Sequence, residues 1–244
     1  MKVASMRIAA PVPVRLGLGS GVSKSTLWAV LLALPFLAML AFATFKPILV
    51  LPRMALAPGF LLTDQAGARL TNEDLRGALV LYNFTYTNCV APCPETGAVM
   101  AAVQAQLPTM ATQGLPVRLV TLSFDPMRDS ADHLRSYAER FGADPAIWRL
   151  ATGEAMPLKY IIGGGFGVYY QPNPAADPKG DFTFEPTFVL VDGAGIVRAK
   201  YRTATPDLAI LRRDIELVVK EAVESTGAGR LVYEAAHLFV CYPK

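Results

Sequence analysis

Two cysteines separated by three residues, Cys89 and Cys93, constrain this chain more than any other feature of its sequence. They follow an apolar run, Ala78 to Tyr82, that is typical of a buried strand, and they precede a helical pattern that starts near Glu95. Pro94 suits the first turn of that helix because the N–H that proline lacks would have no partner there. The positive end of the helix dipole favours a thiolate, so this position predicts cysteines that exchange disulfides or bind a soft metal ion. A structural disulfide or two inert buried thiols would show the same spacing.

The N-terminal part of the chain predicts a membrane anchor. Residues 27–45 form an uncharged apolar run whose helical length, at about 1.5 Å per residue, approaches a hydrocarbon core of roughly 30 Å. Four basic residues precede the run, and no acidic residue occurs before Asp64. The positive-inside rule therefore places the N-terminus in the cytoplasm and the body on the periplasmic side of the inner membrane. Ala41-Phe42-Ala43 also has the form of a signal-peptide cleavage site, and a core helix of a soluble protein is a third interpretation.

The composition of the chain after the N-terminal segment limits the kinds of function that it can have. Beyond the first 63 residues the chain carries slightly more acidic than basic residues, which argues against nucleic-acid binding. Three cysteines are too few for a disulfide-rich scaffold, so a close pair with one left over indicates redox or metal chemistry.

Five segments are predicted along the chain, and the fourth is an α/β domain because its strands alternate with helices. The segments are a disordered cytoplasmic tail (1–26), a transmembrane anchor (27–45), a proline-containing linker (46–57), the α/β domain (58–225) and an apolar C-terminal extension (226–244). Within the domain we expect strands at 60–63, 79–84, 117–124 and 147–150, a hairpin of 187–191 and 196–201, and helices at 96–107, 131–141, 156–162 and 208–223. Three glycines after residue 162 predict a flexible turn, and residues 169–181 predict a surface insertion.

A proline precedes the strand that opens the hairpin. Pro186 stands before Thr187, where thioredoxin folds place a cis-proline beside their reactive cysteines. We therefore include Pro186 among the candidate catalytic residues. An ordinary proline at the start of a strand is the alternative.

Two motifs together resemble one known family. The first is Phe84-Thr85-Tyr86-Thr87 leading into Cys89-x-x-x-Cys93-Pro94, and the second is Ser123-Phe124-Asp125-Pro126 followed by Arg128-Asp129 and a capped helix. From about residue 58 to residue 223 the chain resembles the Sco/SenC family. The resemblance implies a thioredoxin-like fold, a tether to the inner membrane and a role in delivering copper to cytochrome c oxidase. It also implies that Cys89 and Cys93 are copper ligands.

The family's third copper ligand, a histidine, is missing here. Its expected position falls at Phe184, or near Pro186 if the loop is shifted, and no histidine occurs there. Glu185 lies nearby, but a carboxylate suits soft Cu(I) poorly, so we assign it no metal role. His133 is expected to be an exposed helical residue.

The C-terminal extension carries the other histidine. His237 and Cys241 stand four residues apart, a spacing that would place both on one helical face and suit a shared metal ion. An apolar tail that docks on the domain or on a partner, with Cys241 a free thiol, is the interpretation that we favour.

The sequence leads to three functional hypotheses. The first is a membrane-tethered Sco-like protein whose cysteine pair cycles between dithiol, disulfide and Cu(I)-bound forms during maturation of a cytochrome c oxidase. The second is a thiol-disulfide oxidoreductase that acts on a partner protein without copper. The third is a non-catalytic accessory subunit of a respiratory membrane complex.

Overall fold

The computed structural model describes residues 23–45, 48–89, 93–173, 181–239 and 242–243, and the side chains of residues 93–95 are not described. The chain divides into two compact units, residues 1–45 and 46–244, each of which is described by itself.

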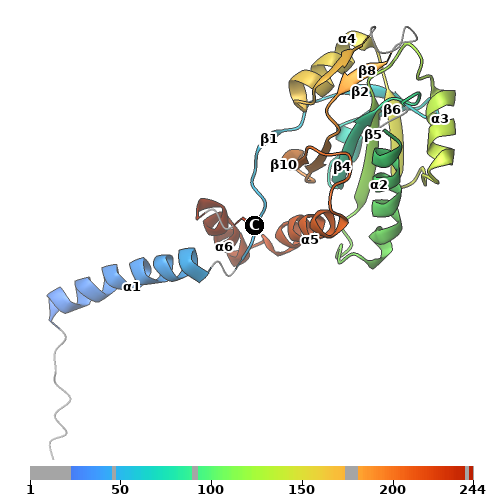
Figure 1. The fold of residues 1–244 in the computed structure, drawn as a ribbon. Helices are drawn as coiled ribbons and strands as arrows, with labels where there is room; N and C mark the ends of the chain where they lie inside the picture. The colour runs from blue at the N-terminus through green and yellow to red at the C-terminus, as the bar shows by residue number, and fades with distance from the viewer. Residues whose placement is uncertain (1–22, 46–47, 90–92, 174–180, 240–241, 244) are drawn as a thin grey trace, which may run out of the picture. The chain divides into compact units, whose positions relative to one another are not determined.

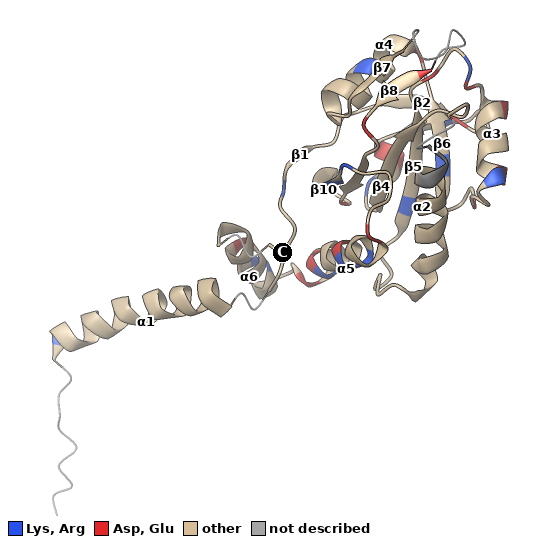
Figure 2. Ribbon diagram, in the orientation of Figure 1, with Lys and Arg blue, Asp and Glu red and all other residues tan. Residues whose placement is uncertain are grey.

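The first unit consists of the helix α1, Lys24–Phe45 (Figure 1). After Lys24 it carries no charged residue, so Figure 2 draws it tan along nearly its whole length. Within the described part of the chain, α1 is the one helix long and apolar enough to cross a membrane. The sequence therefore predicted this helix correctly, and the helix begins three residues before the predicted run.

The second unit is built on an eight-stranded mixed sheet with the order β1-β10-β9-β4-β5-β6-β2-β3. Its strands are β1 (Ala55–Leu56), β2 (Leu61–Asp64), β3 (Arg69–Thr71), β4 (Leu79–Thr85), β5 (Val117–Ser123), β6 (Trp148–Thr152), β9 (Phe188–Val191) and β10 (Ile196–Tyr201). A separate two-stranded sheet pairs β7 (Tyr170–Pro172) with β8 (Phe182–Phe184). The helices are η1 (Glu73–Leu75), α2 (Cys93–Gln106), η2 (Leu107–Thr109), α3 (Ala131–Arg140), α4 (Ala155–Leu158), the π-helix η3 (Lys159–Gly165), α5 (Leu208–Glu224) and α6 (Ala228–Leu238).

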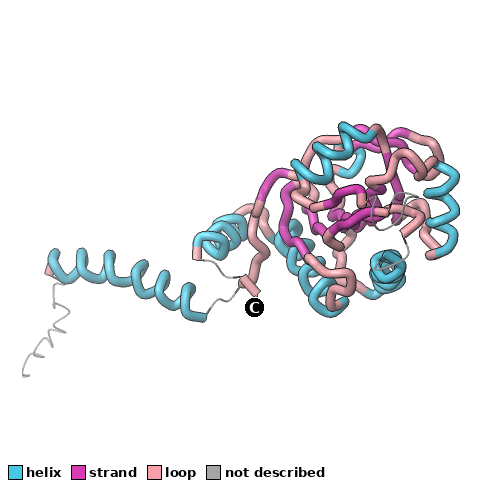
Figure 3. Tube along the Cα trace, turned by 45° about the horizontal axis from the view of Figure 1, so that its top comes forward, coloured by secondary structure: helices cyan, strands magenta, loops and turns pink. Residues whose placement is uncertain are grey.

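Three parallel strands form the centre of the sheet. β4 pairs with β5, and β5 pairs with β6, in parallel, while β9 runs antiparallel to β4 on its other side. All seven residues of β4 are buried, as the apolar run predicted for a strand covered on both faces. Figure 3 shows the strands with helices on both sides. The α/β class expected from the sequence is therefore confirmed.

Two apolar layers cover the two faces of the sheet. One layer contains Met100 of α2, Leu134 of α3 and Ile215 of α5, packed with residues of β4 and β5. The other contains Ile162 and residues of the β7–β8 hairpin, packed with Phe84 and Phe124. Cys89 belongs to the second layer. The candidate site therefore lies at the border of a packed core rather than on an open surface.

The structure adds detail to three of the predicted segments. Residues 169–181 were expected to form a surface insertion. They contain β7, which pairs with the following strand β8 so that Tyr170 lies opposite Phe184. The expected glycine turn is instead the end of η3, where a Cβ on Gly165 would come within 2.4 Å of Pro58. The C-terminal extension forms α6, a helix that packs on α5.

Candidate redox and metal site

Cys89 lies at the carboxyl end of the parallel strands. It follows β4 by four residues, and α2 begins at Cys93, so the connection between strand and helix is short. Its backbone N–H donates to the carbonyl of Tyr86 at 3.3 Å, and only 8% of the residue is exposed. Cys89 is disulfide-bonded in the structure. The thiol that the sequence predicts as its partner, Cys93, has a side chain outside the described residues.

A buried carboxylate holds the chain just before Cys89. Asp129, 1% exposed, accepts a hydrogen bond from the backbone N–H of Thr87 at 2.9 Å and another from the Thr87 hydroxyl at 2.6 Å. The hydroxyl of Ser123, the last residue of β5, also donates to Asp129. Hydrogen bonds to a carboxylate are about twice as strong as those between neutral groups, so these contacts hold the segment that leads to Cys89. Asp129 is therefore a positioning residue.

The sequence also carries a signal for this contact. Thr85 and Ser123 pair directly in the parallel register, so the segments that follow β4 and β5 meet at one edge of the sheet. Asp129 follows β5 and Thr87 follows β4 at that same edge. A search for polar residues after adjacent parallel strands would have predicted the pair.

An aromatic cluster forms the neighbouring wall of the site. The ring centroid of Tyr86 lies 5.5 Å from that of Phe124, 5.1 Å from that of Phe182 and 6.2 Å from that of Phe184. Phe184 also packs on Phe124, with centroids 5.2 Å apart. The residue at the position expected for histidine therefore presents a carbon ring to this wall, and a phenyl ring offers no lone pair to a metal ion.

Tyr86 carries the polar group of this cluster. Its hydroxyl donates to Asp181, and burial followed by this hydrogen bond raises the pKa of Tyr86 to about 12. The same hydrogen bond lowers the pKa of the Asp181 carboxyl. The guanidinium of Arg128 lies 5.7 Å from the centre of the Tyr86 ring. Tyr86 therefore remains a neutral phenol at physiological pH and cannot act as a base there.

The loop after β5 also contains an ion pair. The Nε–H of Arg128 donates to Asp125, which is 3% exposed. Burial raises the pKa of the Asp125 carboxyl, although Arg128 opposes the shift. The backbone N–H of Asp125 donates to the Ser123 hydroxyl at 3.1 Å, which joins this pair to the contacts of Asp129. The motif that led to the family resemblance is thus a network that shapes the loop beside Cys89.

The remaining candidate residues belong to other segments of the fold or lie outside the residues that the structure describes. Pro186 lies between β8 and β9, as expected from the sequence, and the geometry of its peptide bond stays a prediction. His237 contacts Glu221 of α5 at 2.9 Å, and His133 contacts the Ser130 hydroxyl at 2.9 Å. Cys241 lies outside the described residues. Among the residues that are described, no group of three or more histidine, cysteine or acidic side chains is placed to hold a metal ion.

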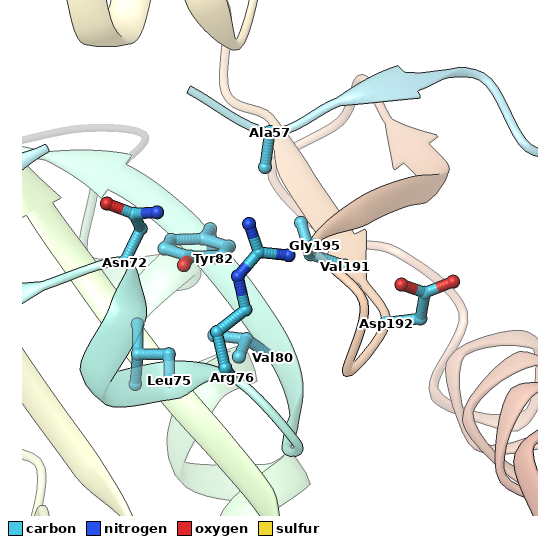
Figure 4. Close-up of a pocket in the computed structure, with 9 residues that line it drawn as sticks. All are labelled: Ala57, Asn72, Leu75, Arg76, Val80, Tyr82, Val191, Asp192 and Gly195. Atoms are coloured by element: carbon cyan, nitrogen blue, oxygen red, sulfur yellow. The ribbon is translucent and has the colours of Figure 1, made fainter. Parts of the chain in front are cut away.

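Hollows of different size border the sheet. The pocket in Figure 4 is lined by Val80 and Tyr82 of β4 together with Arg76 and Gly195, and its volume of about 20 Å³ has room for little more than a water molecule. A larger groove of about 530 Å³ borders Phe124 and Phe182. The larger groove therefore lies along the aromatic wall of the candidate site, whereas the small pocket lies toward the start of β4.

Comparison with known proteins decides the family. The model of the SCO1/SenC family matches residues 51–220. The chain belongs to the SCO1/SenC family. A SCO1 protein homolog of Bacillus subtilis is 30% identical to it over 94 residues, which are 38% of this chain and 47% of that protein. The chain thus spans about half the length of this curated relative.

Solved structures agree with the SCO1/SenC assignment. A copper-bound ScoI of Arabidopsis thaliana superposes with a TM-score of 0.59 at 24% identity, over 69% of this chain and 99% of that one. BsSco, described as a Sco-family cytochrome c oxidase assembly protein with a disulfide switch, superposes with a TM-score of 0.60 at 22% identity, over 70% and 98% of the two chains. At these identities the likeness shows the fold. The thioredoxin-like fold implied by the resemblance is therefore confirmed for this SCO1/SenC protein.

Proposed function

We propose that this SCO1/SenC protein is anchored in the inner membrane and uses Cys89 and Cys93 to bind Cu(I) and to exchange disulfides during the maturation of a cytochrome c oxidase. The observation that carries the proposal is that the segment before Cys89 is held in place, because the buried Asp129 accepts hydrogen bonds from both the backbone N–H and the hydroxyl of Thr87. A cysteine held in this way between a parallel strand and a helix start is suited to reaction with a second thiol or with a soft ion.

The donor set fits Cu(I) better than Cu(II). Two thiolates can hold Cu(I) at low coordination number because soft sulfur suits that ion, whereas Cu(II) prefers additional nitrogen or oxygen donors. The phenyl ring of Phe184 supplies no such donor. The copper-bound structure of the Arabidopsis relative supports copper as the cargo of this fold. We therefore assign Cys89 and Cys93 as the Cu(I) ligands of this chain.

Copper and disulfide chemistry exclude each other at this pair. A partner disulfide that takes two electrons and two protons from the dithiol becomes a dithiol itself and leaves one S–S bond in the pair, and the oxidised pair offers no thiolate to a metal. A reduced partner dithiol restores the pair by attacking one sulfur through a mixed disulfide, and the partner leaves as a disulfide. The oxidation state of the pair thus decides whether the protein can carry copper.

A second function is favoured by one observation. Because Phe184 replaces the third ligand, the protein retains what disulfide exchange needs while it lacks part of a complete copper site. In this alternative the protein is a thiol-disulfide oxidoreductase that acts on a partner of the respiratory chain without carrying copper. The position of Pro186 just before β9 fits both functions.

The proposal includes an anchor that keeps this chemistry outside the cytoplasm. α1 is long enough to span the hydrocarbon core, and the basic residues that precede it favour a cytoplasmic N-terminus. The domain would then face the periplasm, where disulfides form and persist.

The experiment is performed in the cells from which the chain comes. Cytochrome c oxidase activity is measured in membranes after the gene is replaced by the Cys89→Ser/Cys93→Ser variant, with Cys241→Ser as the matched control. The proposal expects loss of activity in the double variant, partial recovery when copper is added to the medium, and normal activity in the control. Recovery with a small-molecule thiol reductant but not with copper would support the second function. Normal oxidase activity in the double variant would contradict both.

A further inference from the structure

Helix α6 has an apolar face that nothing in the described part of the domain covers. Its inner face packs on the domain through Tyr233 and Ala236, which are 2% and 0% exposed. Leu231 and Leu238 stand seven residues apart on the opposite face, and each is 76% exposed. Val232 lies on the same side and is 39% exposed. At 100° per residue, these three side chains lie on a continuous arc without a charged residue.

Polar contacts fix α6 in this orientation. The hydroxyl of Tyr233 donates to Glu224 of α5 at 2.7 Å, and His237 contacts Glu221 of α5 at 2.9 Å. Glu234 pairs with Arg53 at 3.0 Å. Figure 1 shows α6 next to α5 and away from α3. The apolar face therefore points outward because the opposite face is held, rather than because the helix is loose.

The chain between α1 and the domain is short. Val50 is completely buried, and the carbonyl oxygens of Leu51 and Pro52 accept hydrogen bonds from Arg198 at 2.7 and 3.2 Å. The domain thus begins at Val50, only five peptide steps after Phe45, the last residue of α1. Five steps span at most about 17 Å. Arg53, the partner of Glu234 on α6, follows three residues later.

We propose that α6 lies on the outer surface of the bilayer that α1 spans, with Leu231, Val232 and Leu238 inserted at the boundary between headgroups and acyl chains. The inference rests on the proposed membrane anchor. A lipid surface is the occupant because the short connection keeps α6 near the end of the span. An amphipathic helix with an uncharged apolar arc is also stabilised when that arc leaves water.

This placement orients the candidate site. One groove is lined both by Arg53 and Glu234 and by Gly77 and Leu115, which stand just before β4 and β5. α6 therefore lies at the amino end of the parallel strands, and Cys89 follows their carboxyl end. The seven residues of β4 span roughly 23 Å. With α6 on the lipid, the cysteine edge of the sheet faces the aqueous compartment, accessible to a soluble partner domain.

The test uses the full chain reconstituted in phosphatidylcholine vesicles, with and without bromine atoms near the top of the acyl chains, which quench tryptophan emission on contact. Leu238→Trp reports on α6, and Met127→Trp is the control because Met127 is 88% exposed in the loop after β5. Both are made in a Trp28→Phe background, and the remaining Trp148 is completely buried. The unmodified chain, which keeps Trp28 in α1, reports on the anchor itself.

The proposal expects at least about a twofold quenching of the emission from the tryptophan introduced at position 238 and no quenching at position 127. Quenching of Trp28 without quenching at position 238 would overturn the placement of α6 and leave the anchor intact. In that case water or a second protein covers the helix. Equal quenching at positions 127 and 238 would overturn the orientation. Absence of quenching at Trp28 would contradict the anchor, and with it the proposed function.

Discussion

The Asp129 carboxylate accepts two hydrogen bonds from Thr87, which lies two residues before Cys89. One comes from the Thr87 backbone N–H at 2.9 Å and the other from the Thr87 hydroxyl at 2.6 Å. The pair joins residues that are 42 positions apart, from segments that follow two adjacent parallel strands. The pair holds the segment that precedes the cysteine.

We predict that Asp129→Asn loosens this segment and destabilises the domain by about 2 kcal/mol, because it removes charge-assisted hydrogen bonds from a buried position. Urea unfolding measures the free energy, and hydrogen exchange of residues 86–89 measures the local effect. Asp132→Asn is the matched control, since Asp132 is exposed and pairs only with neighbouring Arg135 on α3 among the contacts described. A loss of stability that is equal in the two variants would contradict the assigned role.

The sequence contained the strong local signals of this fold. The apolar run up to Tyr82 predicted β4. The capped helix expected after Asp129 is α3, where the Ser130 hydroxyl accepts a hydrogen bond from the His133 N–H. Pro94 correctly placed the start of α2 at the cysteine pair. Each of these signals lies within a few residues of the element that it predicts, so no tertiary information was needed.

Elements that depend on distant contacts were not predicted. α6 begins after Gly227 without a side-chain cap, and its position depends on Arg53, which lies 181 residues before Glu234. The strands β7 and β8 pair because Tyr170 and Phe182 pack on Phe124, which belongs to a different part of the chain. The contact between Asp129 and Thr87 was not predicted either, since the two residues follow different strands.

A prediction on pH follows from Glu221, which links α5, α6 and β10. Burial acts to raise the pKa of its carboxyl, but hydrogen bonds from Arg198 and His237 outweigh burial and lower it from its ordinary value of 4.5. A lowered pKa in the folded state means that the stabilisation is present above about pH 4.5 and is lost as the pH falls below it.

Glu221→Gln should therefore destabilise the protein by about 3 kcal/mol at pH 7, because Arg198 is left buried with a weaker partner. The difference in the free energy of unfolding between this variant and the unmodified protein should shrink below pH 4.5. Denaturant unfolding at each pH measures it. Glu216→Gln, which disturbs a half-exposed pair with Arg212, should cost less than about 1 kcal/mol. A difference for Glu221→Gln that is constant from about pH 7 to about pH 3.5 would rule out the electrostatic explanation.

Restoring an imidazole at the aromatic wall should change the preference for copper. We predict that Phe184→His strengthens Cu(II) binding at least tenfold, because a nitrogen donor next to two thiolates suits that ion. Cu(II) titration followed by absorption and electron paramagnetic resonance measures the change. Thr183→His is the control, since Thr183 is exposed on the other side of β8. Equal gains in the two variants would show that position 184 does not face the cysteines.

The disulfide at Cys89 is predicted to join it to Cys93 and not to Cys241. Three intervening residues at a helix start allow the two sulfur atoms to meet, whereas Cys241 belongs to a segment at the far end of the chain. Peptide mass mapping under oxidising conditions should find residues 89 and 93 linked, and Cys241→Ser should leave the reduction potential of the pair nearly unchanged. A linked peptide that contains Cys241 would overturn this assignment.

The most direct measurement is an anaerobic Cu(I) titration of the fully reduced protein against a competing chelator of known affinity. The account predicts one Cu(I) per chain, lost in Cys89→Ser/Cys93→Ser and retained in both Cys241→Ser and His237→Ala. It also predicts weaker binding as the pH falls, because protons compete for the thiolates. Absence of Cu(I) binding by the unmodified protein would contradict the central claim and leave disulfide exchange without copper as the function.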